Sequence, residues 1–454
     1  MSTFADQLNA AGMSVGESAA KEAIFGKLLA HLREVHSEEL DCVVAFFVPG
    51  RVELAGKHTD YAGGRSLVCA IDRGICLLAT PRRDAQIRVR SLDLNSEAQF
   101  ALGRNTEPIR GDWSNYVVTV AHRIARDFAD ARTGADMVFG GDLPRSAGMS
   151  SSSAVIIAVF AALAEINSLD GSAFFREFIR TREDLAGYLG AVECGAPFGA
   201  SSGHRGVGTL GGSEDHVAIV CSRARFLRQY SYCPIRFERQ VRFPENHSLV
   251  IGVSGVVADK TGSALEAYNR TSLAARKILE LWRSVTGRDD PSLADAIASA
   301  PDAKDRMRGI LAGATESGFA STVLLNRLAQ FQEESNEIVP GVSDALAAGD
   351  LARVGALMDR SQYLAETCLG NQTAETIELA RSARALGAVA ASAFGAGFGG
   401  SVWALVNSAR AGEFRDAWSA HYRERFPTQA DASEFLITRT GPGLVALRSP
   451  LRTN

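Results

Sequence analysis

The chain has 454 residues, which is long enough for two or three domains and for a sizeable buried core. Hydrophobic residues make up 46% and charged residues 22%, as is ordinary for a globular protein in water. Because 48 lysines and arginines nearly balance 52 aspartates and glutamates, the net charge of −4 argues against a nucleic-acid coat protein or a polybasic membrane binder.

The first half of the chain predicts a mixture of helices and strands. A helix is expected over residues 20–36, because Ile24, Leu28 and Leu32 fall on one face. Apolar runs between turn residues predict the elements that follow. These are strands over 42–48, 66–80 and 87–92, a helix over 115–128, a strand over 135–139, a helix from about 150 to 163 and a short strand over 217–221.

The pattern restarts near residue 245. The expected elements there are a strand over 249–253, helices over 263–285, 291–299, 303–312, 320–334, 342–358 and 375–386, and a late strand over 402–406. Mixed helices and strands with such a restart indicate an α+β fold of two lobes. We expect the lobes to divide into residues 1–245 and 246–454.

The seven cysteines are scattered, odd in number and form no C-x-x-C pair. This usage indicates free thiols in a reducing compartment and argues against a disulfide framework or a structural zinc site. The first residues carry Asp6 and no continuous apolar stretch, so no secretory signal is expected. The longest apolar run, residues 154–164, is too short to span a bilayer. We therefore expect a cytoplasmic protein of the size of an enzyme.

Polar residues gather directly after the first expected strand. Residues 49–64 are Pro-Gly-Arg-Val-Glu-Leu-Ala-Gly-Lys-His-Thr-Asp-Tyr-Ala-Gly-Gly, which places Arg51, Lys57, His58 and Asp60 within ten positions. Such a loop suits a polyhydroxylated ligand, because aspartate accepts hydroxyl protons while histidine and lysine donate. A solvated turn with surface charges explains this segment equally well when it is taken alone.

A second loop, residues 142–154, is rich in glycine and serine and leads into the helix that begins near Ser150. The free N–H groups of a first helical turn and the helix dipole favour an anion. Serine hydroxyls add hydrogen-bond donors and an oxygen ligand for Mg²⁺. A serine cap on a core helix is the simpler alternative, but four consecutive serines exceed what one cap requires. No Gly-Lys-Ser/Thr follows, so this is not a P-loop.

A third loop contains G-x-G-x-x-G at Gly395, Gly397 and Gly400. A dinucleotide fingerprint needs a strand before it and a helix after it, whereas a strand is expected after this loop. We therefore reject the Rossmann interpretation. Glycines here let the backbone approach a ligand or the facing lobe, or they form only a tight turn.

Together the three loops resemble one family. The first resembles the galactokinase signature Gly-Arg-Val-Asn-Leu-Ile-Gly-Glu-His-Thr-Asp-Tyr-Asn-Gly-Gly. The second is similar to the phosphate loop Pro-x-x-x-Gly-Leu-Ser-Ser-Ser-Ala of the GHMP small-molecule kinases, and the third to their C-terminal Gly-x-Gly-Phe-Gly-Gly motif. The resemblance covers roughly residues 44–410 and occurs in the family's order. The first motif is specific to galactokinase-like members, whereas the other two identify the superfamily.

The resemblance implies two α+β lobes that enclose the active site in the cleft between them, with ATP and Mg²⁺ as cofactors. The implied phosphate and cofactor contacts are Gly148, Ser150, Ser151, Ser152 and Gly397. Ser152 is also the implied Mg²⁺ ligand, together with Glu193. His58, Asp60 and Tyr268 correspond to positions that bind the sugar, and Arg51 to an arginine beside the transferred phosphoryl group.

The implied catalytic base is Asp215, in the stretch Gly-Ser-Glu-Asp-His over residues 212–216. The family has Gly-x-x-Asp-Gln there. This chain has extra residues rich in glycine and serine, 201–208, between Glu193 and that stretch.

The main departure from the family is Lys57, which stands where the family has a glutamate that accepts from a sugar hydroxyl. Lysine is a donor only and carries the opposite charge. Lys57 either donates to the same hydroxyl, or pairs with a substrate carboxylate, or turns away and pairs with Glu53, which itself replaces the family's asparagine. The second case predicts a kinase for an acidic sugar such as galacturonate or glucuronate.

The expected activity is ATP-dependent phosphorylation of the anomeric hydroxyl of galactose or a related monosaccharide. Two other functions stay open. One is a catalytically silent protein that binds sugar and ATP as a sensor. The other is a GHMP kinase for a non-sugar alcohol such as mevalonate, against which the residues from His58 to Tyr61 argue. No nucleic acid or membrane partner is expected.

Overall fold

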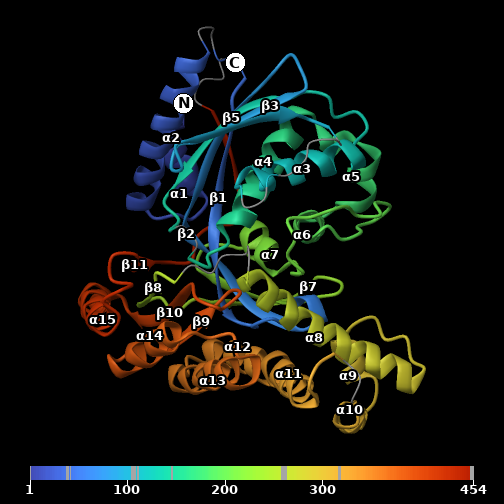
Figure 1. Cartoon of the computed structure of the whole chain (residues 1–454). Helices are drawn as coiled ribbons and strands as arrows, with labels where there is room; N and C mark the ends of the chain where they lie inside the picture. The colour runs from blue at the N-terminus through green and yellow to red at the C-terminus, as the bar shows by residue number, and fades with distance from the viewer. Residues whose placement is uncertain are drawn as a thin grey trace.

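The computed structural model describes residues 2–36, 40, 42–103, 109, 112–144, 147–256, 263–314 and 318–449, with the side chains of 263 and 264 excepted. Figure 1 shows an upper part built on one sheet and a lower part in which a second sheet is covered by helices from the C-terminal half. Long strands of the first sheet run down to the level of the second sheet, so the two parts adjoin.

The first sheet has eight strands. Its main path runs β12-β1-β2-β5-β3-β4, and β6 and β7 extend from the far end of β2. β1 and β2 form a long antiparallel pair that is buried along almost its whole length. The strands are β1 (Val44–Ala55), β2 (Arg65–Pro81), β3 (Gln86–Ser91), β4 (Ser96–Ala101), β5 (Ala135–Gly141), β6 (Phe226–Ser231), β7 (Arg236–Arg242) and β12 (Val445–Arg448).

Helices cover both faces of this sheet (Figure 1). On one face lie α1 (Phe4–Ala10) and α2 (Val15–Val35), whose buried Phe25, Leu28 and Leu32 pack on the strands. On the other face lie α3 (Ser114–Asp127), α4 (Ser151–Ile166), α5 (Ala173–Phe178), α6 (Arg182–Cys194) and α7 (Glu214–Cys221). α4 is apolar on nearly every side, which explains why it lies in the centre of this layer.

The second sheet has four antiparallel strands in the order β11-β8-β10-β9. These are β8 (His247–Val253), β9 (Ala390–Phe394), β10 (Ser401–Asn407) and β11 (Glu434–Thr438). The helices around it are α12 (Val339–Ala348), α13 (Leu351–Leu364), α14 (Ala374–Ala385) and α15 (Ala411–Arg425). One hydrophobic cluster joins both sheets, because Val52 and Leu67 of the first lie in the same core as Ile251 and Trp403 of the second.

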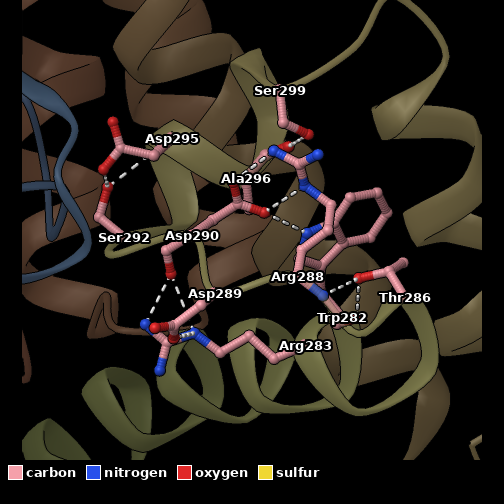
Figure 2. Close-up of polar contacts among 10 residues, drawn as sticks. All are labelled: Trp282, Arg283, Thr286, Arg288, Asp289, Asp290, Ser292, Asp295, Ala296 and Ser299. Carbon is pink, nitrogen blue, oxygen red and sulfur yellow. Dashed lines mark hydrogen bonds and ion pairs between the residues drawn. The ribbon is translucent and has the colours of Figure 1, made fainter.

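Four further helices form a separate small core beside the first of the three loops, residues 49–64. They are α8 (Ser263–Thr286), α9 (Leu293–Ala298), α10 (Ala303–Ala312) and α11 (Ser321–Glu333). Figure 2 shows the polar contacts that fix the connection between α8 and α9. The indole Nε1 of Trp282 donates to Asp290 at 2.8 Å, and Arg288 binds the same carboxylate through two nitrogens at 2.8 Å each. Ser292, at the end of this connection, packs so closely on Gly63 that a side chain on Gly63 would clash with it.

Two of the expected elements are wrong. The strand predicted over residues 217–221 is the second half of α7, which is buried between α6 and the first sheet and therefore lacks the polar face that would mark a helix. The helix predicted over residues 342–358 is two helices, since α12 ends at Gly349 in the left-handed conformation and Asp350 caps α13.

The strand expected after the third loop is confirmed as β10. The division at residue 245 stays a prediction: it falls between β7 and β8, but β12 returns to the first sheet and pairs with β1. Among the described helices, none combines the length and the apolar character needed to cross a lipid bilayer.

Candidate active site

A cavity of about 160 Å³ lies beside β1 and is lined by residues from all three loops singled out in the sequence. Its walls come from β1, the loop after it, the serine loop and the start of α4, the end of α6, the start of α7, and α8. The residues predicted for the site that line this cavity are Arg51, His58, Asp60, Gly148, Ser150, Ser151, Ser152, Glu193, Asp215 and Tyr268. Lys57 and Gly397 are not among the lining residues.

Arg51 and Asp215 form an ion pair on the cavity wall. The guanidinium Nε of Arg51 donates to Oδ1 of Asp215 at 2.6 Å. A second guanidinium nitrogen donates to the carbonyl of Gly148 in the serine loop, and the group lies over the ring of Phe394. Arg51 is only 3% exposed, so these contacts hold its charge in one place. The pair thus joins the end of β1 to the first turn of α7.

Asp60 is oriented by the backbone of α7. Its carboxylate accepts a hydrogen bond from the backbone N–H of Glu214 at 3.1 Å, and Gly212 approaches so closely that a side chain there would clash with it. Burial raises the pKa of Asp60 above its ordinary value. The carboxylate lines the cavity with Tyr268, whose ring lies 5.4 Å from that of His58.

His58 is held as a neutral ring. It adopts a left-handed backbone conformation with φ of 58°. Its Nδ1 lies 3.0 Å from the hydroxyl of Tyr61, and its Nε2 lies 3.0 Å from the carbonyl of Ala396 in the third loop. Burial, with the nearby charge of Arg327, lowers the pKa of His58 from 6.5 to about 4. At neutral pH the ring therefore carries no charge, and both of its nitrogens are engaged by the protein.

The serine loop presents free donors at the start of α4. Gly148 has φ of 71° and Ser150 has φ of 58°, so the chain turns sharply before the helix begins at Ser151. The hydroxyl of Ser150 is buried and has no hydrogen-bond partner among the described residues. First-turn amides, an orphaned hydroxyl and the positive end of a helix dipole together fit a phosphate anion.

Glu193 supplies a carboxylate next to the serine loop and the first turn of α4. Its Oε2 accepts from the hydroxyl of Ser153 at 2.7 Å and lies 3.0 Å from Nε2 of His216. The sequence assigned Ser152 to the same metal as Glu193, but the hydroxyl that the structure places on Glu193 belongs to Ser153. Carboxylate and hydroxyl oxygens are ligands that suit Mg²⁺. Within the described ranges, however, no three histidine, cysteine, aspartate or glutamate side chains come together in a group that could hold a metal ion.

Lys57 lies behind the cavity wall. It is 1% exposed, and its ammonium donates to the hydroxyl of Ser361 on α13 at 2.7 Å. Ser361 in turn donates to Glu334, which also accepts the backbone N–H of Gly56. Of the three alternatives weighed for Lys57, the structure favours the one in which the side chain turns away. Its hydrogen-bond partner is Ser361 rather than Glu53.

Gly397 supports the third loop from outside the cavity. It has φ of 78°, and a side chain there would clash with the backbone carbonyl of Asn371. The residues of this loop that line the cavity are Gly395 and Ala396. The loop therefore reaches the site through its backbone, as the glycine spacing suggested.

Several lining side chains were not predicted as site residues, and Glu53, Glu214 and His216 are among them. Glu53 lies two residues after Arg51 on β1, so both side chains face the cavity. The two-residue period of a strand predicts this shared face. Glu214 and His216 flank Asp215 in the first turn of α7. Because a strand was predicted over residues 217–221, no helical turn was expected here.

Comparisons with known proteins agree with this geometry. Residues 31–81 match the galactokinase galactose-binding signature, residues 115–203 the GHMP kinase N-terminal domain, and residues 342–424 the GHMP kinase C-terminal region. The chain is 30% identical to the galactokinase of Chloroflexus aggregans over 384 residues, which cover 83% of this chain and 87% of that relative. It is also 30% identical to the galactokinase of Chloroflexus aurantiacus, over 79% of this chain and 82% of that one.

The fold has a solved counterpart. The structure of Lactococcus lactis galactokinase complexed with galactose superposes with a TM-score of 0.77 at 24% identity, covering 93% of this chain and all of the other. With the family models and the curated relatives, this match shows that the chain belongs to the galactokinase family of the GHMP kinases and is a galactokinase-like, ATP-dependent sugar kinase.

Proposed function

We propose that this enzyme transfers the γ-phosphoryl group of ATP to the anomeric hydroxyl of galactose or a closely related monosaccharide. The observation that carries the proposal is the Arg51–Asp215 ion pair at 2.6 Å, which lines the same cavity as Asp60, Tyr268 and the serine loop at the start of α4. The curated relatives named galactokinase support the choice of sugar.

Asp215 is suited to hold the proton of the attacking hydroxyl. As the hydroxyl oxygen bonds to the γ-phosphorus and the bond to the β-phosphate oxygen breaks, the proton moves to the Asp215 carboxylate. The Arg51 guanidinium, which already contacts this carboxylate, stabilises the charge that spreads over the phosphoryl oxygens. Asp60 is suited to orient the sugar by accepting hydrogen bonds from its hydroxyls, and the His58 ring lines the cavity beside it.

The serine loop is suited to hold the phosphates of ATP. Gly148, Ser150 and Ser151 offer backbone amides and hydroxyls to these oxygens. Glu193 and the hydroxyls of Ser152 and Ser153 are the oxygen donors that would hold Mg²⁺. When bound, this ion neutralises phosphate charge.

An acidic sugar is disfavoured by the charges around the cavity. Five carboxyl side chains line it (Glu53, Asp60, Glu193, Glu214 and Asp215), and the lining guanidinium of Arg51 is already engaged. Lys57, the residue that suggested a uronate, points its ammonium at Ser361 instead. A substrate carboxylate would therefore meet repulsion without a compensating partner.

The test is ADP formation by the purified chain with ATP, Mg²⁺ and galactose, compared with the Asp215→Asn variant. We expect kcat to fall by roughly 10²- to 10⁴-fold in the variant, because a general base is lost while the side chain keeps its shape. Asp289→Asn, at a side chain that is 99% exposed, is the control and should match the wild type. Sugar binding without ATP turnover in the wild type would support a silent sensor and overturn the proposal.

A further inference from the structure

The loop between β1 and β2, residues 56–64, carries three side chains that line the active-site cavity: His58, Asp60 and Tyr61. Apart from one turn of 3-10 helix at Asp60–Ala62, this β1–β2 loop has no regular structure of its own. The positions of its side chains therefore depend on what holds the loop from outside.

The helix α11 and the π-helical turn Glu334–Ile338 that continues it hold the backbone at the start of this loop. The carboxylate of Glu334 accepts from the backbone N–H of Gly56 at 2.8 Å and from that of Lys57 at 3.4 Å. One turn earlier, the side-chain amide of Gln330 donates to the carbonyl of Lys57 at 3.0 Å. Successive residues of the loop are thus bound by successive turns of one helix.

Arg327, one further turn back on α11, contacts the part of the loop that reaches the cavity. One nitrogen of its guanidinium donates to the backbone carbonyl of His58 and, at 3.3 Å, to the hydroxyl of Tyr61. A second nitrogen donates to the side-chain oxygen of Gln330. Because the hydroxyl of Tyr61 lies 3.0 Å from Nδ1 of His58, this one guanidinium fixes both lining side chains.

The charge of Arg327 is buried without a carboxylate among its hydrogen-bond partners. The residue is 2% exposed, its acceptors are a carbonyl, a phenol and an amide, and its Nε has no hydrogen-bond partner in the described part of the chain. Burying a charge without a counter-ion costs free energy, so general stabilisation does not explain an arginine here. A planar group with several N–H donors explains it, because it reaches α11 and the loop at the same time.

We propose that Arg327 is a positioning residue for the sugar: it holds His58 and Tyr61 in place on the cavity wall, so that its loss weakens sugar binding and leaves ATP binding unchanged. Within the described ranges, its hydrogen bonds go to the β1–β2 loop and to α11, and none goes to the serine loop. This inference rests on the proposed function, because it assumes that the cavity binds a sugar.

Arg327 also lines a second cavity, of about 210 Å³, between α8, α11 and the third loop. Two of the residues that line it, Arg270 and Val323, are exposed, so this cavity is within reach of solvent. When the side chain of Arg327 is removed, a guanidinium ion can therefore enter from this side and bind the same acceptors.

The experiment measures KM for galactose and for ATP, and the dissociation constant of galactose by calorimetry, in the wild type, Arg327→Ala and Arg327→Lys. Lysine keeps the charge but lacks the planar fork. We expect both variants to raise KM and the dissociation constant of galactose by roughly tenfold or more, with KM for ATP unchanged. Guanidinium chloride, far below the concentration that unfolds the protein, should restore galactose affinity to Arg327→Ala, whereas equal sodium chloride should not.

Leu311→Ala on α10 is the matched control for a structural loss. Leu311 is fully buried in the same small core, and α10 packs on α8, α9 and α11. This variant should lower the melting temperature and leave KM for galactose unchanged. A rise in galactose KM equal to that of the Arg327 variants would show that any loosening of this core weakens sugar binding, and it would overturn the inference.

The outcomes separate the inference from the proposed function. Unchanged galactose affinity in Arg327→Lys, an equal rise in KM for ATP, or a folded Arg327→Ala that does not respond to guanidinium overturns the inference and leaves the sugar kinase in place. If Arg327→Ala does not fold, Arg327→Lys decides. If the wild type phosphorylates no sugar, the proposed function fails and calorimetry decides: weaker galactose binding in the variants supports the inference, and equal binding, or none in the wild type, overturns it.

Discussion

Lys57 occupies a position of the galactokinase signature at which a charged side chain is expected to meet the sugar. Its ammonium instead lies 2.7 Å from the hydroxyl of Ser361, inside a buried network that includes Glu334. A side chain in this position connects the loop after β1 to α13, so its effect should be on the framework of the site rather than on the choice of substrate.

Replacement of Lys57 by methionine should therefore lower stability without creating tolerance for acidic sugars. We expect a loss of about 3 kcal/mol in the free energy of unfolding, because the negative charge of Glu53 loses a nearby buried cation. Urea unfolding measures this loss. Lys277→Met, at a partly exposed pair with Glu280, should change stability by no more than about 0.5 kcal/mol.

The ratio of galactose to galacturonate turnover gives the second readout for Lys57. It should be the same in the wild type and in Lys57→Met, provided that the variant is assayed while folded. A ratio that collapses in the variant would show that the ammonium does reach the substrate.

His58 makes the stability of the site region depend on pH. The pKa of His58 is about 4 in the folded chain and near 6.5 when the chain is unfolded. Between these values the unfolded state binds more protons, so the contribution of this ring to stability is complete above pH 6.5 and declines as the pH falls towards 4. The slope from one such group approaches 1.4 kcal/mol per pH unit.

In His58→Gln, the plot of unfolding free energy against pH should be flatter than that of the wild type between pH 4 and 6.5. Urea denaturation at several pH values in this range measures both curves. Parallel curves would mean that His58 titrates normally in the folded protein.

At the residue scale, the sequence predicted which segments meet but not how every side chain points. The resemblance to the galactokinase family implied that Arg51, Asp60 and Asp215 share one site, and all three line the same cavity. The direction of Lys57 depends on Ser361, which lies 304 residues further along the chain, and no local pattern reports such a contact. Long-range partners of this kind become visible only when the fold is known.

At the scale of single elements, the connection between α8 and α9 holds its shape through one carboxylate. Asp290 accepts from the indole of Trp282 and from two nitrogens of Arg288 (Figure 2). The hydrogen bonds from Arg288 lower the pKa of Asp290. Its neighbour Asp289 is 99% exposed and reaches Arg283 only at 3.9 Å.

Asp290→Ala should therefore destabilise the chain by about 2 kcal/mol, because the buried N–H of Trp282 would lose its acceptor. Asp289→Ala is the adjacent control, and it should differ from the wild type by about 0.5 kcal/mol or less. Thermal or urea unfolding of both variants distinguishes them. Equal losses in the two would show that the network of Asp290 adds nothing to stability.

The elements themselves were predicted unevenly, for physical reasons. α2 was identified because its apolar residues recur at helical spacing, and α4 because its apolar run is too long for a typical strand. α7 was mistaken for a strand since a short apolar run that is buried on every side has no period to read. The break between α12 and α13 has a local signal, Gly349-Asp350, which was overlooked within a continuous helical pattern.

At the scale of the whole molecule, the two sheets share a core. Val52 and Leu67 of the first sheet lie in one hydrophobic cluster with Ile251 and Trp403 of the second, and β12 returns from the end of the chain to pair with β1. The series of strands and helices that begins again near residue 245 indicated two lobes. Such a series carries no information on the contacts between the lobes. The sequence alone could therefore not show that they depend on each other.

Because of this shared core, the lobes should unfold together. Far-ultraviolet circular dichroism reports on both sheets, while tryptophan fluorescence is weighted towards the second half of the chain, which holds Trp282, Trp403 and Trp418. In urea the two signals should give coincident transitions. Two well-separated midpoints would contradict a common core.

The most direct measurement of the activity itself is ³¹P NMR of the reaction with galactose, ATP and Mg²⁺. We expect a resonance for a sugar phosphorylated at the anomeric oxygen, appearing together with ADP, and a slowing of roughly 10²- to 10⁴-fold in Asp215→Asn. Phosphate found on another hydroxyl, or free phosphate as the sole product from ATP, would contradict it.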